Sequence, residues 1–571
     1  MRMTRSIAAL LALCAVCPMA VAQALRPGGE SRLSLDLMRR APEDGDRIDV
    51  IVRYKDQTNA LVRHSRAKLI EVGMASVRVT PAELRHLEQD PDVEYLAPDR
   101  PVAATHFPPW MYMEAIGYRF AAMTVPERPI ETGAGVFVAV LDSGVNEDAY
   151  FKTSPACTAT RVVYHRNFVT TESTTADLYG HGTHVAGIVG GDGVCLGSAI
   201  TSPLNAVAPK VNIVNLRVLD KDGRGKDSYV IAAIDHAIAL KKAGTIPVRV
   251  INLSLGRPVR ESFRLDPLCQ AVEKAWKAGI VVVVAAGNGG RDNSLNTQGY
   301  GTIGSPANDP YVITVGATRM VGHTGYEDDT VASYSSKGPS AIDQVMKPDL
   351  VAPGNIVYAR LDPSQYLVKS YQANSIGIGW SGVNVQNVFL LSGTSMAAPM
   401  VAGGVALMLQ KDSSLKPDQI KARLMKTAYK AMVPGASIVD TAAGVTYNVT
   451  HDAFTVGAGH YNLKAALANT DKPSSKLLAL SPWVKWTNGK AQVVKTYPSL
   501  PTSILWGESV LWGESLVWGD LVMKSGSLVA PSSVLWGEST QSGFSLLWGD
   551  SVLWGDTLNL FDEALSIQGD R

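Results

Sequence analysis

The run Val136-Phe137-Val138-Ala139-Val140-Leu141-Asp142 is the stretch that decides the fold of this chain. It is almost wholly apolar and rich in valine, which is typical of a strand buried on both faces of a sheet. Four similar runs follow, separated by helical patterns: VNIVNLRVL (211–219), VRVINLSLG (248–256), IVVVVAAGN (280–288) and YVITVGA (311–317). This alternation predicts an α/β fold with a doubly wound, mostly parallel sheet and helices on both faces.

Composition and charge exclude several classes of protein. The 571 residues leave room for two or three folded units. With 46% hydrophobic and 18% charged residues, the chain is neither disordered nor a coiled coil throughout. Lys and Arg number 53 against 52 Asp and Glu, so no overall charge attracts nucleic acid or anionic lipid. We therefore expect no nucleic-acid partner.

The first 22 residues are predicted to be a signal peptide. Arg2 and Arg5 precede the uncharged run Ser6–Ala24, in which Ala20 and Ala22 have the spacing of a signal cleavage site. A membrane anchor is the less favoured alternative, because it needs about 20 apolar residues. No later run is long and apolar enough to span a bilayer. We expect a secreted, extracellular protein with no stable membrane span.

A small α+β unit is predicted before the main sheet. Strands are expected over 48–54, 76–79 and 93–96, and helices over Thr58–Glu71 and from Pro81 onward. A proline-rich joint follows this unit. Its prolines are Pro98, Pro101, Pro108 and Pro109.

Three short motifs carry the candidate chemistry. Asp142 ends the first strand, His181 begins the sequence HGTH, and Ser395 opens an apolar helix. Each has an ordinary alternative, such as a capping residue for Asp142 or Ser395. His181 and His184 lack a third ligand and the HExxH pattern, so a metal site is not favoured. The chain order Asp, His, Ser, however, is one of the orders in which catalytic triads occur.

Asp142-Ser143-Gly144, His181-Gly182-Thr183-His184 and Gly393-Thr394-Ser395-Met396-Ala397 together resemble the active-site signatures of the subtilisin-like serine proteases. Further blocks are also similar to this family over roughly 107–468. They are Ser254-Leu255-Gly256, Ala285-Ala286-Gly287-Asn288, the block 347–354 and the block 457–462. The resemblance implies a secreted serine endopeptidase with a subtilisin-like fold, preceded by a small α+β (ferredoxin-like) propeptide.

The roles of the catalytic residues follow from their chemistry. The hydroxyl of Ser395 needs a base within hydrogen-bond reach, and His181 suits that task because its unperturbed pKa is about 6.5. Asp142 would hold the imidazole tautomer. The resemblance implies that Asn288 and the backbone N–H at Ser395 stabilise the oxyanion. No cofactor is required for this chemistry.

The resemblance also implies how protein and peptide substrates bind. An extended peptide would add as a strand beside Ser254, Leu255 and Gly256, so that main-chain bonds supply most of the affinity. Gly304 is placed at the base of the first pocket, where a missing side chain leaves room. We expect broad specificity with a large apolar residue before the scissile bond. The residues expected to bind substrate are Ser254, Leu255, Gly256, Ala285, Gly287 and Gly304.

The resemblance divides the chain into a signal peptide (1–22), a propeptide (23–106), a catalytic domain (107–468) and a C-terminal extension (469–571). The propeptide is expected to act as folding chaperone and intramolecular inhibitor. We expect the enzyme to remove it by a cut between about Asp99 and Pro109, and to act as a monomer.

Two loops depart from compact members of the family. Cys157 lies in an insertion after Asp142, and Cys195 lies in the loop 190–207, which often binds calcium in the family. We predict a Cys157–Cys195 disulfide, because both lie in surface insertions and export gives an oxidising compartment. Cys269, in a helical pattern, is expected to be a buried free thiol. Asp192 and Asn205 are candidate calcium ligands, but the loop lacks the ordered series of carboxylates that is typical of calcium sites. Structural calcium is therefore expected from the resemblance alone, and the sequence does not identify a metal.

A hexad repeat fills the C-terminal extension. Six tryptophans begin Trp-Gly-Glu or Trp-Gly-Asp triplets at spacings that are multiples of six. Because six is even, a strand would carry every tryptophan on one face. We predict a β-rich repeat module over about 504–560, and leave open whether it binds substrate or a cell surface, or merely packs on the catalytic domain or is removed. The tryptophans are Trp506, Trp512, Trp518, Trp536, Trp548 and Trp554.

A second function class is a non-catalytic surface or adhesion protein that uses the protease core as a scaffold and the repeat tail for binding. The intact triad argues against it, because a scaffold would be free to lose any of the three residues. A lipase or esterase is also disfavoured, because Ser395 lies in GTSMA and not in GxSxG.

Overall fold

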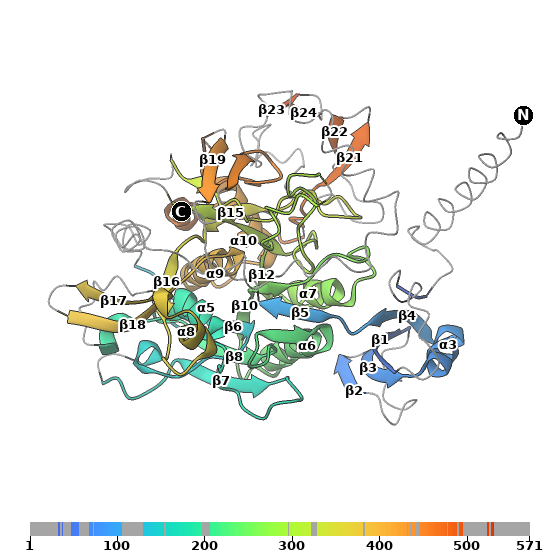
Figure 1. The fold of residues 1–571 in the computed structure, drawn as a ribbon, viewed down its shortest axis with the longest axis horizontal. Coiled ribbons are helices and arrows are strands. Elements are labelled where there is room, and N and C mark those ends of the chain that lie inside the picture. Colours follow the sequence, from blue (N-terminus) through green and yellow to red (C-terminus); the bar gives the residue numbers. More distant parts are fainter. Residues whose placement is uncertain are drawn as a thin grey trace, which may run out of the picture.

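The structure is a computed structural model that describes residues 32–34, 37, 47–55, 68–71, 73–104, 130–153, 156–196, 206–294, 296–320, 328–380, 383–430, 432–433, 435–440, 445–476, 478–487, 490–494, 522–524 and 527–529. The predicted signal peptide and the six tail tryptophans lie outside these residues. Figure 1 shows a large body with a smaller N-terminal unit at its side.

The body is built on an eight-stranded sheet in the order β14-β13-β12-β10-β6-β8-β7, with β15 also paired to β13. The pairs are parallel except for β13 with β14. The apolar runs of the sequence supply its strands, which confirms the predicted fold class. The strands are β6 (Phe137–Asp142), β7 (Val162–Asn167), β8 (Asn212–Arg217), β10 (Val248–Leu253), β12 (Val281–Ala285), β13 (Ile313–Arg319), β14 (Thr330–Val331) and β15 (Leu350–Pro353).

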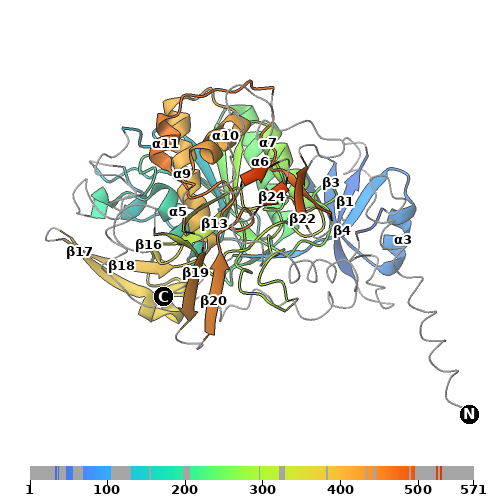
Figure 2. The same cartoon turned by 90° about the horizontal axis from the view of Figure 1, so that it is seen from above.

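Helices cover both faces of this sheet (Figure 2). Helices α6 and α7 pack on each other and against β6, β10 and β12, while α5 and α9 pack on each other and against strands from β6 to β15. Every residue of β12 is consequently at most 4% exposed, which explains the continuous apolar runs. The helices are α5 (His181–Gly190), α6 (Asp227–Ala243), α7 (Pro267–Lys277), α8 (Tyr366–Ser370), α9 (Thr394–Lys411), α10 (Pro417–Thr427) and α11 (Leu463–Ala468).

The N-terminal unit is a four-stranded antiparallel sheet in the order β2-β3-β1-β4, with helix α3 packed on it. Helix α3 begins with a capping box, in which the Thr80 hydroxyl accepts from the Glu83 N–H and the Glu83 carboxylate accepts from the Thr80 N–H. The elements are β1 (Ile48–Tyr54), β2 (Lys68–Glu71), β3 (Met74–Val79), α3 (Pro81–Gln89) and β4 (Val93–Pro98).

The helix predicted over Thr58–Glu71 is wrong at its end. Residues 68–71 form strand β2, which pairs antiparallel with β3. Gly73, with a φ of +85°, makes the chain reversal between the two strands. A four-residue segment is too short for its periodicity to distinguish a strand from the end of a helix. Residues 58–67 lie outside the described residues.

Strand β5 carries the chain from the N-terminal unit into the body (Figure 1). It lies between β9 and β11 and is antiparallel to both, with Ala104 opposite Leu255 and Ala103 opposite Gly256. The N-terminal unit is therefore joined to the body by main-chain pairing. The three strands are β5 (Pro101–Ala104), β9 (Arg224–Lys226) and β11 (Leu255–Gly256).

Smaller elements surround the central sheet. The strands form a three-stranded sheet β16-β18-β17, a hairpin β19–β20 and a sheet β21-β22-β24-β23. These strands are β16 (Val357–Arg360), β17 (Ser375–Trp380), β18 (Val383–Leu391), β19 (Gly435–Asp440), β20 (Val445–Thr450), β21 (Trp483–Thr487), β22 (Lys490–Val494), β23 (Val522–Lys524) and β24 (Ser527–Val529). The 3-10 helices are η1 (Ala149–Phe151), η2 (Gly193–Leu196) and η3 (Gln372–Asn374).

Packing into the body continues beyond the predicted boundary at residue 468. Ser481 is buried, donates to a carboxylate oxygen of Asp349 at 2.5 Å and accepts from the ammonium of Lys421 at 2.8 Å. Leu480 and Val484 are also buried. The start of the C-terminal extension is therefore part of the same core. Among the described residues, no helix has the length and apolarity that crossing a bilayer requires.

Cys157 and Cys195 form a disulfide with their Cα atoms 5.6 Å apart. It connects the chain after η1 with η2, and these two short helices pack together. Cys269 is a buried free thiol, as the sequence predicts.

We predict that the free energy of unfolding of the double variant Cys157→Ser/Cys195→Ser is lower than that of the wild type by roughly 3 to 4 kcal/mol. Without the disulfide, the unfolded chain regains the conformational entropy that closing the loop removes. Thermal unfolding with and without dithiothreitol measures this effect. Reductant should lower the Tm of the wild type and leave that of the double variant unchanged. An equal response of both proteins would contradict the prediction.

Candidate active site

Strand β6 places Asp142 at the carboxyl end of the central sheet, beside the first residue of helix α5. There the Oδ1 atom of Asp142 lies 2.7 Å from Nδ1 of His181, and neither side chain is more than 1% exposed. The same oxygen accepts from the N–H of Ser143 at 2.8 Å, which fixes the carboxylate. A carboxylate in this position favours the tautomer with the proton on Nδ1 and leaves Nε2 as the basic atom.

The close approach of helix α5 to strand β6 requires a glycine at position 182. A Cβ atom there would lie 2.2 Å from the carbonyl oxygen of Gly144 and 3.0 Å from Cβ of Asp142. The N–H of Gly182 donates to the hydroxyl of Ser143 at 2.9 Å. Any side chain at 182 would push the helix away and lengthen the contact between Asp142 and His181.

Asp177 is a positioning residue that no motif in the sequence indicates. Its buried carboxylate accepts from the N–H groups of Gly180 at 2.7 Å and Thr183 at 2.8 Å, and from the hydroxyl of Ser143 at 2.8 Å. It therefore ties the first turn of α5 to the loop after β6. Burial raises the pKa of Asp177. The only signal in the sequence was an aspartate just before a helix start, which is common.

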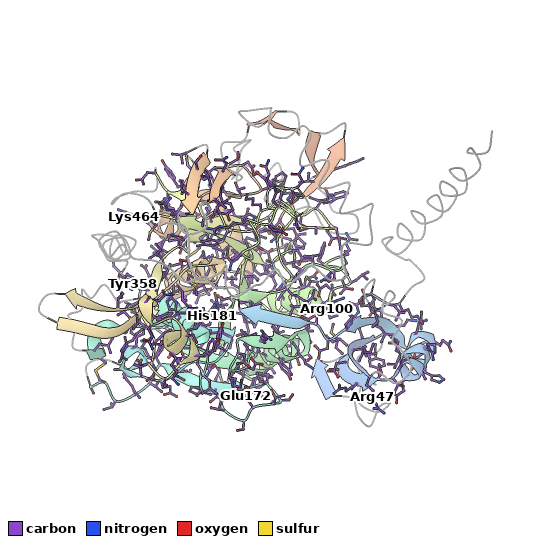
Figure 3. The ribbon with its side chains drawn as sticks, in the orientation of Figure 1. Arg47, Arg100, Glu172, His181, Tyr358 and Lys464 are labelled. Carbon is purple, nitrogen blue, oxygen red and sulfur yellow. A yellow bond between two sulfur atoms is a disulfide. The ribbon has the colours of Figure 1, made fainter. Side chains whose placement is uncertain are left out.

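Helix α9 places Ser395 in its first turn, at the same end of the sheet. The Ser395 hydroxyl donates to the carbonyl oxygen of Ser254 at 3.1 Å, and the Ser254 hydroxyl donates to the carbonyl oxygen of Ser395 at 2.8 Å. Because α9 also packs against α5, which begins at His181 (Figure 3), the three predicted catalytic residues belong to elements that contact one another.

Asn288 is held by the start of helix α9. Its Oδ1 atom accepts from both the N–H and the hydroxyl of Thr394, each at 3.0 Å. The N–H of Gly287, which has a φ of +108°, donates to the Thr394 hydroxyl at 3.1 Å. The Nδ2 atom of Asn288 is buried, and no residue in the described part of the chain accepts its hydrogen bonds. Such a donor is costly to bury unless a ligand accepts from it.

Of the residues expected to bind substrate, one contacts Ser395 and the others lie on segments connected to it. Ser254 contacts it directly and precedes β11, where Leu255 and Gly256 pair with β5. The remaining three are on adjacent segments. Ala285 ends β12, Gly287 contacts Thr394, and the N–H of Gly304 donates to the carbonyl oxygen of Ala286 at 3.1 Å.

Gly304 faces the backbone of Arg257, the residue just after strand β11. A Cβ atom on Gly304 would lie 3.0 Å from the carbonyl oxygen of Arg257, and one on Gly256 would lie 3.0 Å from that of Ser305. The two segments are also joined by paired hydrogen bonds between Arg257 and Ser305, of 2.7 and 3.0 Å. The absence of side chains at both glycines allows this close contact.

Of the two candidate calcium ligands, the structure describes only Asp192. Among the described residues, no group of three or more His, Cys, Asp or Glu could hold a metal ion. Asp192 is buried, and its carboxylate lies 2.5 Å from the ammonium of Lys210, so a cation of the chain already neutralises it. It does not fit a calcium ligand, and Asn205 lies outside the described residues. His184 contacts the carbonyl oxygen of Phe389 at 3.0 Å, and burial lowers its pKa to about 3.

Comparison with known proteins agrees with this arrangement. The family model described as "Subtilase family" matches residues 133–459. Serine protease AprX of Bacillus subtilis (strain 168) is 36% identical over 293 residues, which cover 51% of this chain and 60% of that protein. Subtilisin DY of Bacillus licheniformis is 36% identical over 296 residues, which cover 52% of this chain and 84% of that protein.

A solved structure supports the same fold. The crystal structure of fervidolysin from Fervidobacterium pennivorans, described as a keratinolytic enzyme related to subtilisin, superposes with a TM-score of 0.54 at 21% identity, over 78% of this chain and 64% of fervidolysin. The family match spans more than half of the chain and includes Asp142, His181 and Ser395. The chain therefore belongs to the subtilase family.

Proposed function

We propose that this chain is a secreted serine endopeptidase that cleaves peptide bonds through an acyl-enzyme. The Ser395 hydroxyl attacks the scissile carbonyl carbon while His181 accepts its proton, and His181 then gives that proton to the leaving amine. Asp142 orients the imidazole and stabilises the imidazolium. A water molecule then attacks the ester carbonyl and restores the free hydroxyl, again with His181 as base. None of these steps needs a cofactor.

The observation that carries this proposal is the buried contact of 2.7 Å between Asp142 and His181, at the end of the sheet where Ser395 lies. The environment of the oxyanion supports it further. The N–H at the start of α9 and the Nδ2 atom of Asn288 are two donors for the negative oxygen of the tetrahedral intermediate. In the precursor, the described residues provide no acceptor for that Nδ2 atom.

We propose that residues 1–22 are a signal peptide and that residues 23–106 are an inhibitory propeptide, which the enzyme removes itself. Strand β5 supports the second point, because it pairs with Leu255 and Gly256, the strand at which an extended substrate is expected. A substrate cannot add to β11 on this side while β5 is there. Inhibition would end when the chain is cut and the N-terminal unit leaves.

The register of β5 predicts the bond that is cut. Ala104 lies opposite Leu255 and Ala103 opposite Gly256. If the chain kept this antiparallel register for one more residue, Thr105, which lies outside the described residues, would come opposite Ser254, whose carbonyl oxygen contacts the Ser395 hydroxyl. We therefore propose cleavage between Thr105 and His106, within the joint that the sequence indicates.

Specificity is proposed to be broad, with a large apolar residue before the scissile bond. Main-chain pairing supports the broad part, because it does not depend on side chains. The apolar part rests on the resemblance to the family, because the structure explains Gly304 by its close contact with the backbone of Arg257. The proposed maturation site does not follow this preference, because Thr105, the residue before its scissile bond, is small and polar.

The catalytic domain is proposed over 107–468 and the C-terminal extension over 469–571. The enzyme is proposed to be a monomer. Any structural calcium is proposed to bind elsewhere than at Asp192.

We predict that Ser395→Ala abolishes proteolysis and leaves the precursor uncut, because only the nucleophile is removed. Intact-mass measurement of purified, protease-free full chain checks both effects. Ser413→Ala, at an exposed residue beyond the other end of α9, is the matched control and should process normally. A processed Ser395→Ala product would show that another nucleophile or another protease cuts the chain.

Asn288→Ala is predicted to lower kcat by about 10²- to 10³-fold with little change in KM, which is the cost known for loss of the oxyanion amide in subtilisin. Steady-state kinetics on a peptide substrate measure it. Asn288→Asp keeps the acceptor for Thr394 and removes the donor, so it should be impaired as well. A kcat close to that of the wild type in both variants would exclude the oxyanion role.

The mature protein is predicted to begin at His106, because an extension of the register of Ala103 and Ala104 would bring the preceding bond to Ser395. N-terminal sequencing of the product released by the purified precursor gives the answer directly. A start outside 99–109 would contradict the assignment of β5 as the strand that leads into the active site.

A further inference from the structure

Glu261 is a buried carboxylate of the body whose partners belong to the N-terminal unit. Its Oε1 atom lies 2.5 Å from a guanidinium nitrogen of Arg100, with the two side chains 2% and 6% exposed. The hydroxyl of Tyr95 donates to its Oε2 atom. Among the described residues these two are its side-chain hydrogen-bond partners. Removal of the N-terminal unit would therefore leave this carboxylate without either of them.

Arg100 lies on the path of the strand that leads into the active site (Figure 3). Its carbonyl oxygen accepts from the N–H of Asp227 at 2.8 Å, which continues the main-chain pairing of β5 beyond Pro101. Counted back from the bond between Thr105 and His106, Arg100 is the sixth residue. A peptide that occupied the same path after maturation would bring its own sixth residue to Glu261.

The charges around Glu261 favour a cation at this place. Three buried carboxylates, those of Glu261, Asp227 and Asp266, interact with two guanidinium groups, of Arg100 and Arg257. Arg257 is already shared, since it donates to Asp227 at 2.9 Å and to Asp266 at 2.7 Å. When Arg100 leaves with the N-terminal unit, three carboxylates remain beside one guanidinium. Burial raises the pKa of Glu261 in the precursor, and release to solvent removes that effect.

We infer that Glu261 forms a substrate subsite in the mature enzyme that selects a basic side chain, arginine above all, at the sixth position before the scissile bond. This inference rests on the proposed protease function, and it adds a side-chain preference to the proposed substrate-binding site. Arginine offers the planar donors that a carboxylate binds best. The propeptide would then be an inhibitor that places the preferred side chain in the subsite.

Two quenched peptides test this inference. One carries residues 100–107 of this chain, Arg-Pro-Val-Ala-Ala-Thr-His-Phe, and the other has Gln in place of the Arg. The wild-type mature enzyme should cleave the Arg peptide with a kcat/KM about tenfold higher, mainly through a lower KM, as expected of one charge-assisted contact at a partly hydrated site. In Glu261→Gln the ratio should fall to about one.

Controls separate the subsite from other roles. Glu261→Gln could impair folding of the precursor by leaving the buried Arg100 without its carboxylate partner. The double variant Arg100→Gln/Glu261→Gln avoids this unpaired charge. Because residue 100 is removed on maturation, the single and double variants give the same mature sequence. Asp343→Asn removes another buried carboxylate, one bound by Ser262, and should keep the tenfold ratio.

The outcomes distinguish the subsite from the activity. Equal cleavage of the two peptides by the wild type, or an unchanged ratio in Glu261→Gln, overturns the subsite and leaves the protease function standing. Cleavage of neither peptide by a wild-type enzyme that still hydrolyses casein overturns the subsite alone, whereas hydrolysis of neither the peptides nor casein overturns both.

Discussion

The candidate active site depends on one close backbone contact, between the loop after strand β6 and the first turn of helix α5. Only a glycine at position 182 permits it, because a Cβ atom would lie 2.2 Å from the carbonyl oxygen of Gly144. The contact brings His181 to Asp142, and the carboxylate of Asp177 holds it by accepting from both sides. The imidazole is thereby fixed before any substrate binds, which is what electrostatic preorganisation requires.

The second constraint is the strand position between β9 and β11. Main-chain pairing there does not depend on side chains, and in this structure the chain fills the position with its own residues 101–104. Side chains beyond that strand make further contacts: Arg100 pairs with Glu261, and Asp99 accepts from the N–H of Ser228 at the start of helix α6 at 2.9 Å. Inhibition and substrate preference would therefore use the same surface.

The sequence predicts the central sheet well because burial on both faces leaves continuous apolar runs. Its motifs also single out Asp142 and His181, whose side chains lie in contact. It does not reveal Asp177, since an aspartate before a helix is ordinary. Nor does it reveal the pair Arg100 and Glu261, because residues 161 positions apart in separate units share no local pattern. Strand β2 was missed because only its pairing with β3 defines it. The packing of Ser481 into the body likewise depends on distant partners, Asp349 and Lys421.

The most direct test of the central claim is labelling of the mature protein with a fluorophosphonate, followed by mass spectrometry of its peptides. The reagent reacts with a serine only where a base activates the hydroxyl. We predict one adduct, on the peptide that contains Ser395, and loss of that adduct in His181→Ala. Absence of labelling in a folded, processed protein, or labelling of another serine, would contradict the assignment of this site.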